Sequence, residues 1–311
     1  MEEIAFILGL NFLIVVGCMI ALWLISIPVG DVSYIDSFWA YGMVVVAAVT
    51  YHMAGGADMR QQILLLLTAL WGFRLGTYLF LRWRREGPDG RYVALLSKAP
   101  GNRHLYSLRK VFLLQAPLLW LVALPVQLGQ IDSQPASLGI LGYAGILLAL
   151  TGLFFETVGD WQLSRFKADP ANKGKVLDTG LWRYTRHPNY FGDACVWWGL
   201  YLIAAETATG RWAIVSPLFL TYILVKWSGV PLLERRLKRS RPGYQDYLER
   251  TSAFIPWPPK KKNRGHEAGA HAACIGRQGC LDYGCGQGHW PRHGVGAGPA
   301  WRQRAGQQPP T

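Results

Sequence analysis

Charged residues are scarce in this sequence, and acidic ones are the scarcest. Only 16% of the 311 residues are charged, with 19 Asp and Glu against 32 Lys and Arg. Soluble domains carry about 25% charged residues, so the composition argues against an ordinary water-soluble domain. In a soluble protein the net charge of +13 would suggest a nucleic-acid partner. Here we expect it to reflect membrane topology and an anionic ligand, with no nucleic acid.

Cysteine is also scarce, with five residues in all. Cys18 and Cys195 fall in predicted helices, where they fit as small apolar packing residues. Four further residues could be considered for zinc, but their spacing matches no common structural site: Cys274, Cys280, Cys285 and His289. The sequence therefore predicts neither a disulfide framework nor a metal site.

Apolar residues, by contrast, are abundant and make up 51% of the chain. Seven segments reach the roughly 18–20 residues that a membrane-spanning helix needs. They are residues 4–27, 38–55, 62–81, 109–130, 137–159, 190–207 and 212–233. The first follows Glu2 and Glu3 rather than a basic stretch, so we expect a retained helix and not a signal peptide. The sequence predicts an all-α, polytopic membrane helix bundle of about seven transmembrane helices.

Lys and Arg are concentrated in alternate loops. Three loops are rich in cations, at residues 82–109, 165–186 and 235–241, whereas the loops on the other side hold only Arg60 and Arg211. The positive-inside rule then places the N-terminus outside and the three basic loops in the cytoplasm.

Proline and composition mark further boundaries. Proline within the fourth and seventh segments predicts kinks; these residues are Pro117, Pro125, Pro217 and Pro231. From about Asn263 the chain becomes rich in Gly, Ala, Gln and His without apolar periodicity. We therefore expect a membrane domain over residues 1–258 and a disordered, basic and Gly-rich tail over residues 259–311.

Polar residues gather at one place between apolar runs, in the stretch "GLWRYTRHPNYFGD" of residues 180–193. Just before it, Glu156 and Asp160 are four residues apart and so share one helix face. Three cationic segments meeting at one membrane face would form a pocket for a multiply charged anion, and the rings among them could stack on a planar base. The alternative is that these cations and rings only anchor the helices at the bilayer surface.

Three residues of the first helices are candidates for chemistry. Arg74 lies within the third apolar segment, so it should pair inward with Glu156 or Asp36, or contact the substrate. Tyr78, or an Asp36 kept protonated by burial, could donate a hydrogen bond to a developing oxyanion. Asp36 can equally be a solvated loop carboxylate, and Arg74 can equally form a purely structural ion pair.

Two stretches carry a family resemblance: "NKGKVLDTGLWRYTRHPNYFGD" and "LLERRL…RPGYQDYLERTSAFIPW". Together they resemble the C-terminal domain of the steroid 5-alpha-reductase superfamily, most closely its bacterial branch of unknown function, and the likeness extends over about residues 30–258. The stretch "NKGK" is similar to the version in sterol C14-reductases. The related isoprenylcysteine carboxyl and phospholipid methyltransferases share the R-H-P-x-Y pattern.

The resemblance implies an integral membrane enzyme, in a bacterial inner membrane, that uses NADPH to reduce a carbon–carbon double bond in a lipid or steroid-like enone. Its catalytic candidates are Asp36, Tyr78 and Arg74. It also implies that the half of the domain at about residues 137–258 binds the cofactor from the cytoplasmic side. The implied cofactor-binding residues are Arg84 (or Arg85), Asp160, Arg165, Lys167, Asn172, Lys175, Tyr184, Arg186, His187, Asn189, Tyr190, Asp193, Glu234, Tyr244 and Tyr247.

Two other functions remain open from the sequence. A membrane methyltransferase that uses S-adenosylmethionine would share the R-H-P-x-Y pattern, but its cofactor carries no phosphate to occupy so many cations. A non-enzymatic transporter or scaffold would need a pathway of charges within the membrane, and only Arg74 and Glu156 clearly qualify.

Overall fold

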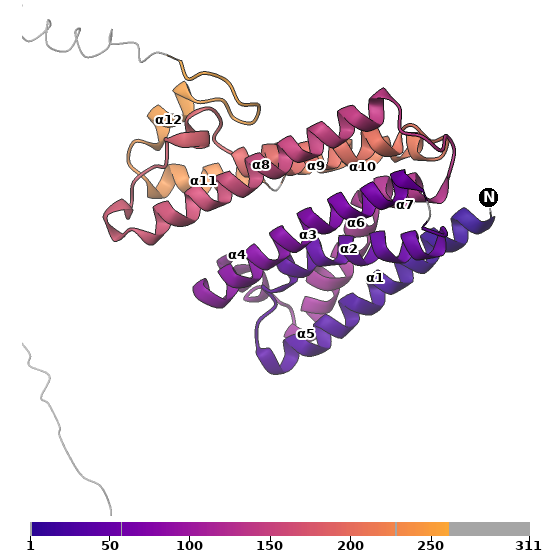
Figure 1. The fold of residues 1–311 in the computed structure, drawn as a ribbon. Helices are drawn as coiled ribbons and strands as arrows, with labels where there is room; N and C mark the ends of the chain where they lie inside the picture. Colours follow the sequence, from indigo (N-terminus) through magenta and orange to yellow (C-terminus); the bar gives the residue numbers. More distant parts are fainter. Residues whose placement is uncertain (1, 57, 228, 261–311) are drawn as a thin grey trace, which may run out of the picture. The chain divides into compact units, whose positions relative to one another are not determined.

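The computed structural model describes residues 2–56, 58–227 and 229–260, and every regular element in these ranges is helical (Figure 1). An isolated bridge between Thr185 and Ser252 is the sole β pairing among them. The chain divides into two units, Met1–Lys261 and Lys262–Thr311, and the first contains everything discussed below. Nearly all of the predicted disordered tail lies outside the described residues.

The helices follow one another as in Figure 1. They are α1 (Glu2–Val29), α2 (Ile35–Met53), α3 (Met59–Glu86), α4 (Gly90–Leu96), α5 (Arg103–Ser107), the π-helical turn η1 (Leu108–Phe112), α6 (Leu113–Val122), α7 (Leu124–Ile131), α8 (Ile140–Ala168), the 3₁₀ turns η2 (Pro170–Asn172) and η3 (Gly180–Arg183), α9 (Pro188–Ala204), the 3₁₀ turn η4 (Gly210–Ile214), α10 (Val215–Tyr222), the π-helical turn η5 (Ile223–Trp227), α11 (Val230–Ser240) and α12 (Tyr244–Arg250).

Four helical stretches in the described residues are long and apolar enough to cross a membrane: Glu2–Val29, Met59–Glu86, Arg103–Val122 and Ile140–Ala168. The predicted all-helical membrane protein is thus confirmed. The count of seven spans stays a prediction. The remaining three ranges are helical, but α9 has 17 residues, α10 has eight, and α2 carries Asp36 and His52 near its ends.

The two proline-containing segments are interrupted, as the prolines suggest. The fourth segment breaks at Ala123, and Pro125 then lies in the first turn of α7. The seventh is divided into η4, α10, η5 and α11, with Pro231 in the first turn of α11. Because proline lacks an N–H, it fits the first turn of a helix, where that donor has no partner within the helix. The irregularities in both segments agree with the kinks that the prolines predict.

Glycines allow α8 and α9 to lie in close contact along their length (Figure 1). Gly145 and Gly152 of α8 face Gly199 and Gly192 of α9. A Cβ on Gly145 would come within 2.5 Å of the Gly199 carbonyl oxygen, and one on Gly152 within 2.5 Å of the Gly192 carbonyl oxygen. Small residues at such spacing let membrane helices approach closely. This packing brings the acidic turn of α8 against the start of α9.

A pair of buried indoles connects α3 with α9. Trp71 and Trp197 are fully buried, and their rings meet edge to face with centroids 5.2 Å apart. Edge-to-face contact is a favoured arrangement for aromatic rings. The contact places the middle of α3 next to α9 and therefore next to the polar groups described below.

Buried amides join α1, α2 and α7 inside the bundle. The Asn11 side-chain amide donates to Thr50 Oγ1 at 2.8 Å and to Gln127 Oε1 at 3.1 Å. All three side chains are fully buried. Interhelical hydrogen bonds of this kind help to hold membrane helices together where water is absent.

Candidate functional site

Exposed aromatic residues on α8 indicate where the bilayer surface lies. Tyr143 and Trp161 are both exposed and are 18 residues apart (161 minus 143) on the same helix. At 1.5 Å per residue this is about 27 Å, close to the roughly 30 Å thickness of the hydrocarbon layer. The Arg165 guanidinium lies over the Trp161 ring at 5.2 Å, a typical interfacial pairing. We therefore expect Asp160 to lie close to the bilayer boundary.

Next to this boundary, α3, α8 and α9 form what we call the acidic cluster: Arg74, Glu156, Asp160, Asn189 and Asp193. Arg74 pairs with Glu156, and its Nη1 lies 2.7 Å from Asp160 Oδ2. The Asn189 side-chain amide donates to the second oxygen of Asp160 at 3.2 Å. Arg74 thus pairs inward, as an arginine inside a membrane should, and it pairs with both acids of α8.

The acidic cluster contains more acceptors than donors. Three carboxyl groups gather around the single guanidinium of Arg74. Asp193 Oδ1 and Glu156 Oε2 are buried and have no hydrogen-bond partner in the described part of the chain, and the same holds for the donor Arg74 Nε. Buried polar atoms are normally paired, so the cluster is suited to bind a molecule that brings N–H groups and a hydrogen-bond acceptor, as a carboxamide does.

Tyr78 lies on the same face of α3 as Arg74, one turn further along. Its hydroxyl accepts a hydrogen bond of 3.4 Å from Ser164 of α8. The side chain therefore lies in the α3–α8 contact, beside the acidic cluster, where the sequence analysis expected a hydrogen-bond donor.

The cation on this face of α3 is Arg82, which the sequence analysis missed. Arg82 is half-buried and lies within electrostatic range of Asp160 and of Asp89. Arg84 and Arg85, the predicted cations, are exposed and form no ion pair within the described residues. The signal was available: positions 74, 78 and 82 are four residues apart and so share one face.

The R-H-P-N-Y segment is held by α11. Arg186 Nε donates to Glu234 Oε1 at 2.7 Å, and His187 Nε2 lies 3.2 Å from the same oxygen. His187 is 1% exposed, and its ring stacks on Tyr190 at 5.4 Å. Burial alone would raise the pKa of Glu234, but the hydrogen bonds from His187 and Arg186 lower it below its usual value. Two residues of the motif are thus fixed by one carboxylate.

The two tyrosines of α12 are buried packing residues. Tyr244 and Tyr247 are 3% and 2% exposed, and the Tyr247 hydroxyl donates to the Trp182 carbonyl. Burial, together with the Glu234 charge, raises the pKa of Tyr244 to about 12. The hydrogen bond of Tyr247 to Trp182 joins α12 to the residues just before the motif.

The remaining predicted cofactor residues are exposed or half-buried: Arg165 and Lys167 at the end of α8, and Asn172, Lys175 and Tyr184 in the segments between α8 and α9. Lys167 is 3.8 Å from Glu86, which brings the first and second basic loops together. The Arg241 guanidinium donates to the Lys175 carbonyl, and this hydrogen bond brings the second and third basic loops together. A pocket of about 270 Å³ opens here, and three cations contribute to its lining: Lys167, Lys173 and Arg241. Asn172 also lines it, whereas Tyr184 lies near the start of α9 with its side chain exposed.

Asp36 begins α2 and is bonded on both oxygens, so it is not a free loop carboxylate. Arg91 Nη2 donates to one oxygen at 2.7 Å, and the Tyr92 hydroxyl donates to the other at 2.6 Å. Burial raises the pKa of Tyr92 above its usual value, and the charge of Asp36 adds a smaller increase. Sequence reasoning missed Tyr92, because nothing local indicates that α4 returns to the start of α2.

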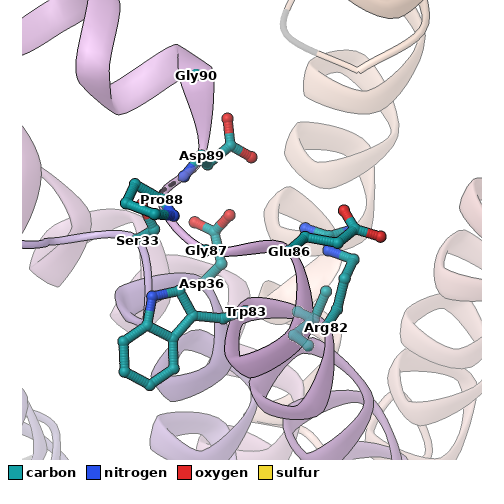
Figure 2. A pocket seen from close by; sticks show the side chains of 10 residues that line it. Ser33, Asp36, Arg82, Trp83, Glu86, Gly87, Pro88, Asp89 and Gly90 are labelled. Carbon is teal, nitrogen blue, oxygen red and sulfur yellow. Dashed lines mark hydrogen bonds between the residues drawn. The ribbon is translucent and has the colours of Figure 1, made fainter.

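Figure 2 shows the pocket beside Asp36, which has a volume of about 200 Å³. Its polar lining comes from three elements: Asp36 from α2, Arg82 and Glu86 from α3, and Asp89 from the turn before α4. Arg82 thus lies between this pocket and the acidic cluster. The two groups of polar residues are neighbours at one end of the helices.

Comparison with known proteins assigns the family. Residues 22–251 match the family described as "Protein of unknown function (DUF1295)". The chain belongs to this family.

Two curated relatives extend the comparison. The DUF1295 chain is 24% identical over 289 residues to the uncharacterized protein C594.04c of Schizosaccharomyces pombe, covering 81% of this chain and 79% of the relative. It is also 28% identical over 149 residues to a Delta(14)-sterol reductase of Ascobolus immersus, covering 42% of this chain and 32% of that protein. No solved structure matches the chain. These likenesses support a steroid reductase-like superfamily, as the motifs predict.

Within the DUF1295 chain, the predicted site residues fall into separate groups. Arg74, Asp160, Asn189 and Asp193 come together in the acidic cluster, with Tyr78 at its edge. A second group holds the motif: Arg186, His187, Tyr190, Glu234, Tyr244 and Tyr247. Arg165 and Lys167 at the end of α8, with Asn172 and Lys175 of the loop after it, form a third group, and Asp36 belongs to the neighbouring pocket. Their roles stay predictions.

Proposed function

We propose that this DUF1295 protein is a membrane-embedded reductase that uses NADPH to reduce a carbon–carbon double bond in a lipid or steroid-like enone. The observation that carries the proposal is the hydrogen-bonded acidic cluster of α3, α8 and α9, which lies at the bilayer boundary beneath cationic loops. The likeness to the Delta(14)-sterol reductase, although limited to 32% of that protein, supports the same activity.

The residues present fit NADPH in charge and in hydrogen-bonding capacity. Its phosphates need cations, and Lys173 is exposed and forms no ion pair within the described residues. Lys173 also lines the larger pocket beside Lys167 and Arg241. The amide of the nicotinamide needs acceptors, and the unpaired oxygens of the acidic cluster supply them. Charge-assisted hydrogen bonds of this kind are among the strong ones.

When bound, NADPH would supply the hydride. The chain would do the rest: loop cations hold the phosphates, and the acidic cluster orients the ring. We infer that Tyr78 polarises the substrate oxygen, because its hydroxyl accepts from Ser164 and keeps its own proton free to donate, whereas the Tyr92 hydroxyl already donates to Asp36. A preoriented donor acts on the charge that develops in the transition state, which is commonly the largest catalytic effect.

The finer topology belongs to the same proposal. We propose that α2, α9 and the α10 segment also cross the bilayer, which gives seven spans with the N-terminus outside. The cofactor would then bind from the cytoplasm of a bacterial cell, in the half of the domain at residues 137–258. The alternation of cationic and cation-poor loops supports this arrangement.

Calorimetric titration of the full chain in detergent tests the proposal. NADPH should bind, and Lys173→Ala should weaken binding by about tenfold, since one charge-assisted contact is lost. Lys110→Ala, at an exposed lysine of η1, is the matched control and should bind as the wild type does. A well-folded preparation that binds S-adenosylmethionine and not NADPH would instead support the methyltransferase.

A further inference from the structure

An exposed group of aromatic, apolar and cationic side chains lies where the R-H-P-N-Y motif meets the segment after α12. We call it the interfacial patch: Arg183, Tyr184, Ile255, Trp257 and Lys260. Ile255 and Trp257 are 66% and 70% exposed, although they are large apolar residues on a non-helical segment. The backbone N–H of Trp257 donates to the Tyr184 carbonyl at 2.9 Å, so the segment after α12 lies next to Arg183 and Tyr184.

The patch lies at the same level as the interfacial residues of α8. The Trp182 indole N–H donates to the Gly159 carbonyl at 3.1 Å, which places the residues next to Trp182 beside the end of α8. Trp161, two residues after Gly159, is exposed beneath Arg165. The patch is therefore at the depth where α8 leaves the hydrocarbon layer.

We propose that the interfacial patch binds the headgroup layer of an anionic phospholipid leaflet. Ile255 and Trp257 enter the boundary between headgroups and acyl chains, and Arg183 and Lys260 pair with lipid phosphates. Trp and Tyr favour this depth because one end of each ring is apolar and the other polar. Each cation close to an anionic surface strengthens binding about fivefold. A membrane is the favoured partner, since its headgroups already lie at this level.

This binding would affect the motif, because the same segment holds it in place. The Ser252 carbonyl accepts from the Arg186 N–H at 2.9 Å, and the Phe254 carbonyl accepts from Thr185 Oγ1 at 2.8 Å. The Arg186 guanidinium also donates to the Thr251 carbonyl. A segment anchored in the leaflet keeps these acceptors in position, so lipid charge controls how firmly the motif is held.

Amide hydrogen exchange of the full chain in lipid nanodiscs tests the proposal. Residues 252–260 should exchange several-fold more slowly in discs of phosphatidylcholine with phosphatidylglycerol than in discs of phosphatidylcholine alone. The double variant Ile255→Ser, Trp257→Ser should lose this difference, and so should Arg183→Gln, Lys260→Gln, which keeps the apolar residues. Trp212→Ser, at an exposed indole of η4, is the matched control and should keep it.

Two outcomes would overturn the proposal. One is equal exchange of residues 252–260 in both kinds of disc, with helices intact by circular dichroism. The other is protection that persists in detergent and rises with protein concentration, together with a lower mass of the Ile255→Ser, Trp257→Ser variant by light scattering. That result would mean that a second copy of the chain covers the patch.

Discussion

At the scale of single residues, pairing explains how α3 can carry an arginine within the membrane. Arg74 makes two ion pairs at once, and Asn189 completes the hydrogen bonding of Asp160. The sequence suggested part of this, because an arginine inside an apolar run needs an acid and Glu156 and Asp160 share a face. The resemblance suggested Asp193 as a site residue, but not its place beside Glu156, which depends on the close packing of α8 on α9.

Substitution of Arg74 should therefore lower the stability of the protein. Arg74→Met leaves Glu156 and Asp160 buried without their cation, and breaking a buried pair in this way typically costs about 3–5 kcal/mol. Thermal unfolding in detergent measures the loss. Arg84→Met, at an exposed arginine of the same helix, should change little. Equal melting temperatures for the two variants would mean that the acidic cluster does not stabilise the bundle.

The contribution of Glu234 to the stability of the protein depends on pH. Because its pKa is lowered in the folded protein, its contribution to stability is present above the unfolded value of about 4.3 and is lost as the pH falls through the folded value. Glu234→Gln should be less stable than the wild type at neutral pH, and the difference should shrink in acid. Melting temperatures across pH measure this; a difference that stays constant with pH would contradict it.

Two tyrosines compete for the role of hydrogen-bond donor, and substitution separates them. Tyr78→Phe should lower the rate of NADPH oxidation with a steroid enone about a hundredfold, the size of effect seen when one oriented donor is lost, and should leave NADPH affinity unchanged. Tyr143→Phe, at an exposed residue of α8, is the control. If Tyr92→Phe causes the large loss and Tyr78→Phe does not, the donor lies on α4 and not on α3.

At the scale of helices, the sequence was informative about extent and uninformative about pairing. Length and apolarity are local properties, so α1 was predictable to within two residues at each end, whereas α3 and α8 continue five and nine residues beyond the predicted ends of their apolar segments. The contact of Tyr92 with Asp36 joins residues 56 apart, and it depends on how the short helix α4 folds back. The glycines of α8 and α9 recur every seven residues in the sequence, but whether they allow close packing depends on which helix faces which.

That glycine contact predicts a position-specific effect of a larger side chain. Gly152→Val would force a Cβ against the Gly192 carbonyl and the Val196 N–H, both within 2.6 Å. Overpacking of this kind costs about 1–3 kcal/mol, and backbone atoms cannot move aside as a flexible side chain can. Gly9→Val in α1, where a Cβ would meet nothing within 4 Å, is the control. Unfolding in detergent should separate the two variants.

At the scale of the whole molecule, the number of spans decides on which sides of the membrane the two ends of the domain lie. Seven spans place residues 3 and 260 on opposite sides, whereas the four long apolar stretches alone would place residue 3 and the loop after α8 on the same side. The charge bias of the loops favours seven, and the interfacial residues on α8 fix where one span begins and ends. The sequence and the helices thus make a prediction that labelling can test.

In a cysteine-free background, Glu3→Cys and Ser133→Cys should react with a membrane-impermeant maleimide on intact cells. Asp169→Cys and Lys260→Cys should react only after the cells are permeabilised, because seven spans place the loop after α8 and the segment after α12 in the cytoplasm. Ser133 lies between α7 and α8, so its labelling checks the sidedness of α8 independently of α1. Labelling of Asp169→Cys on intact cells would reverse the orientation, and with it the side from which the loop cations could receive a cofactor.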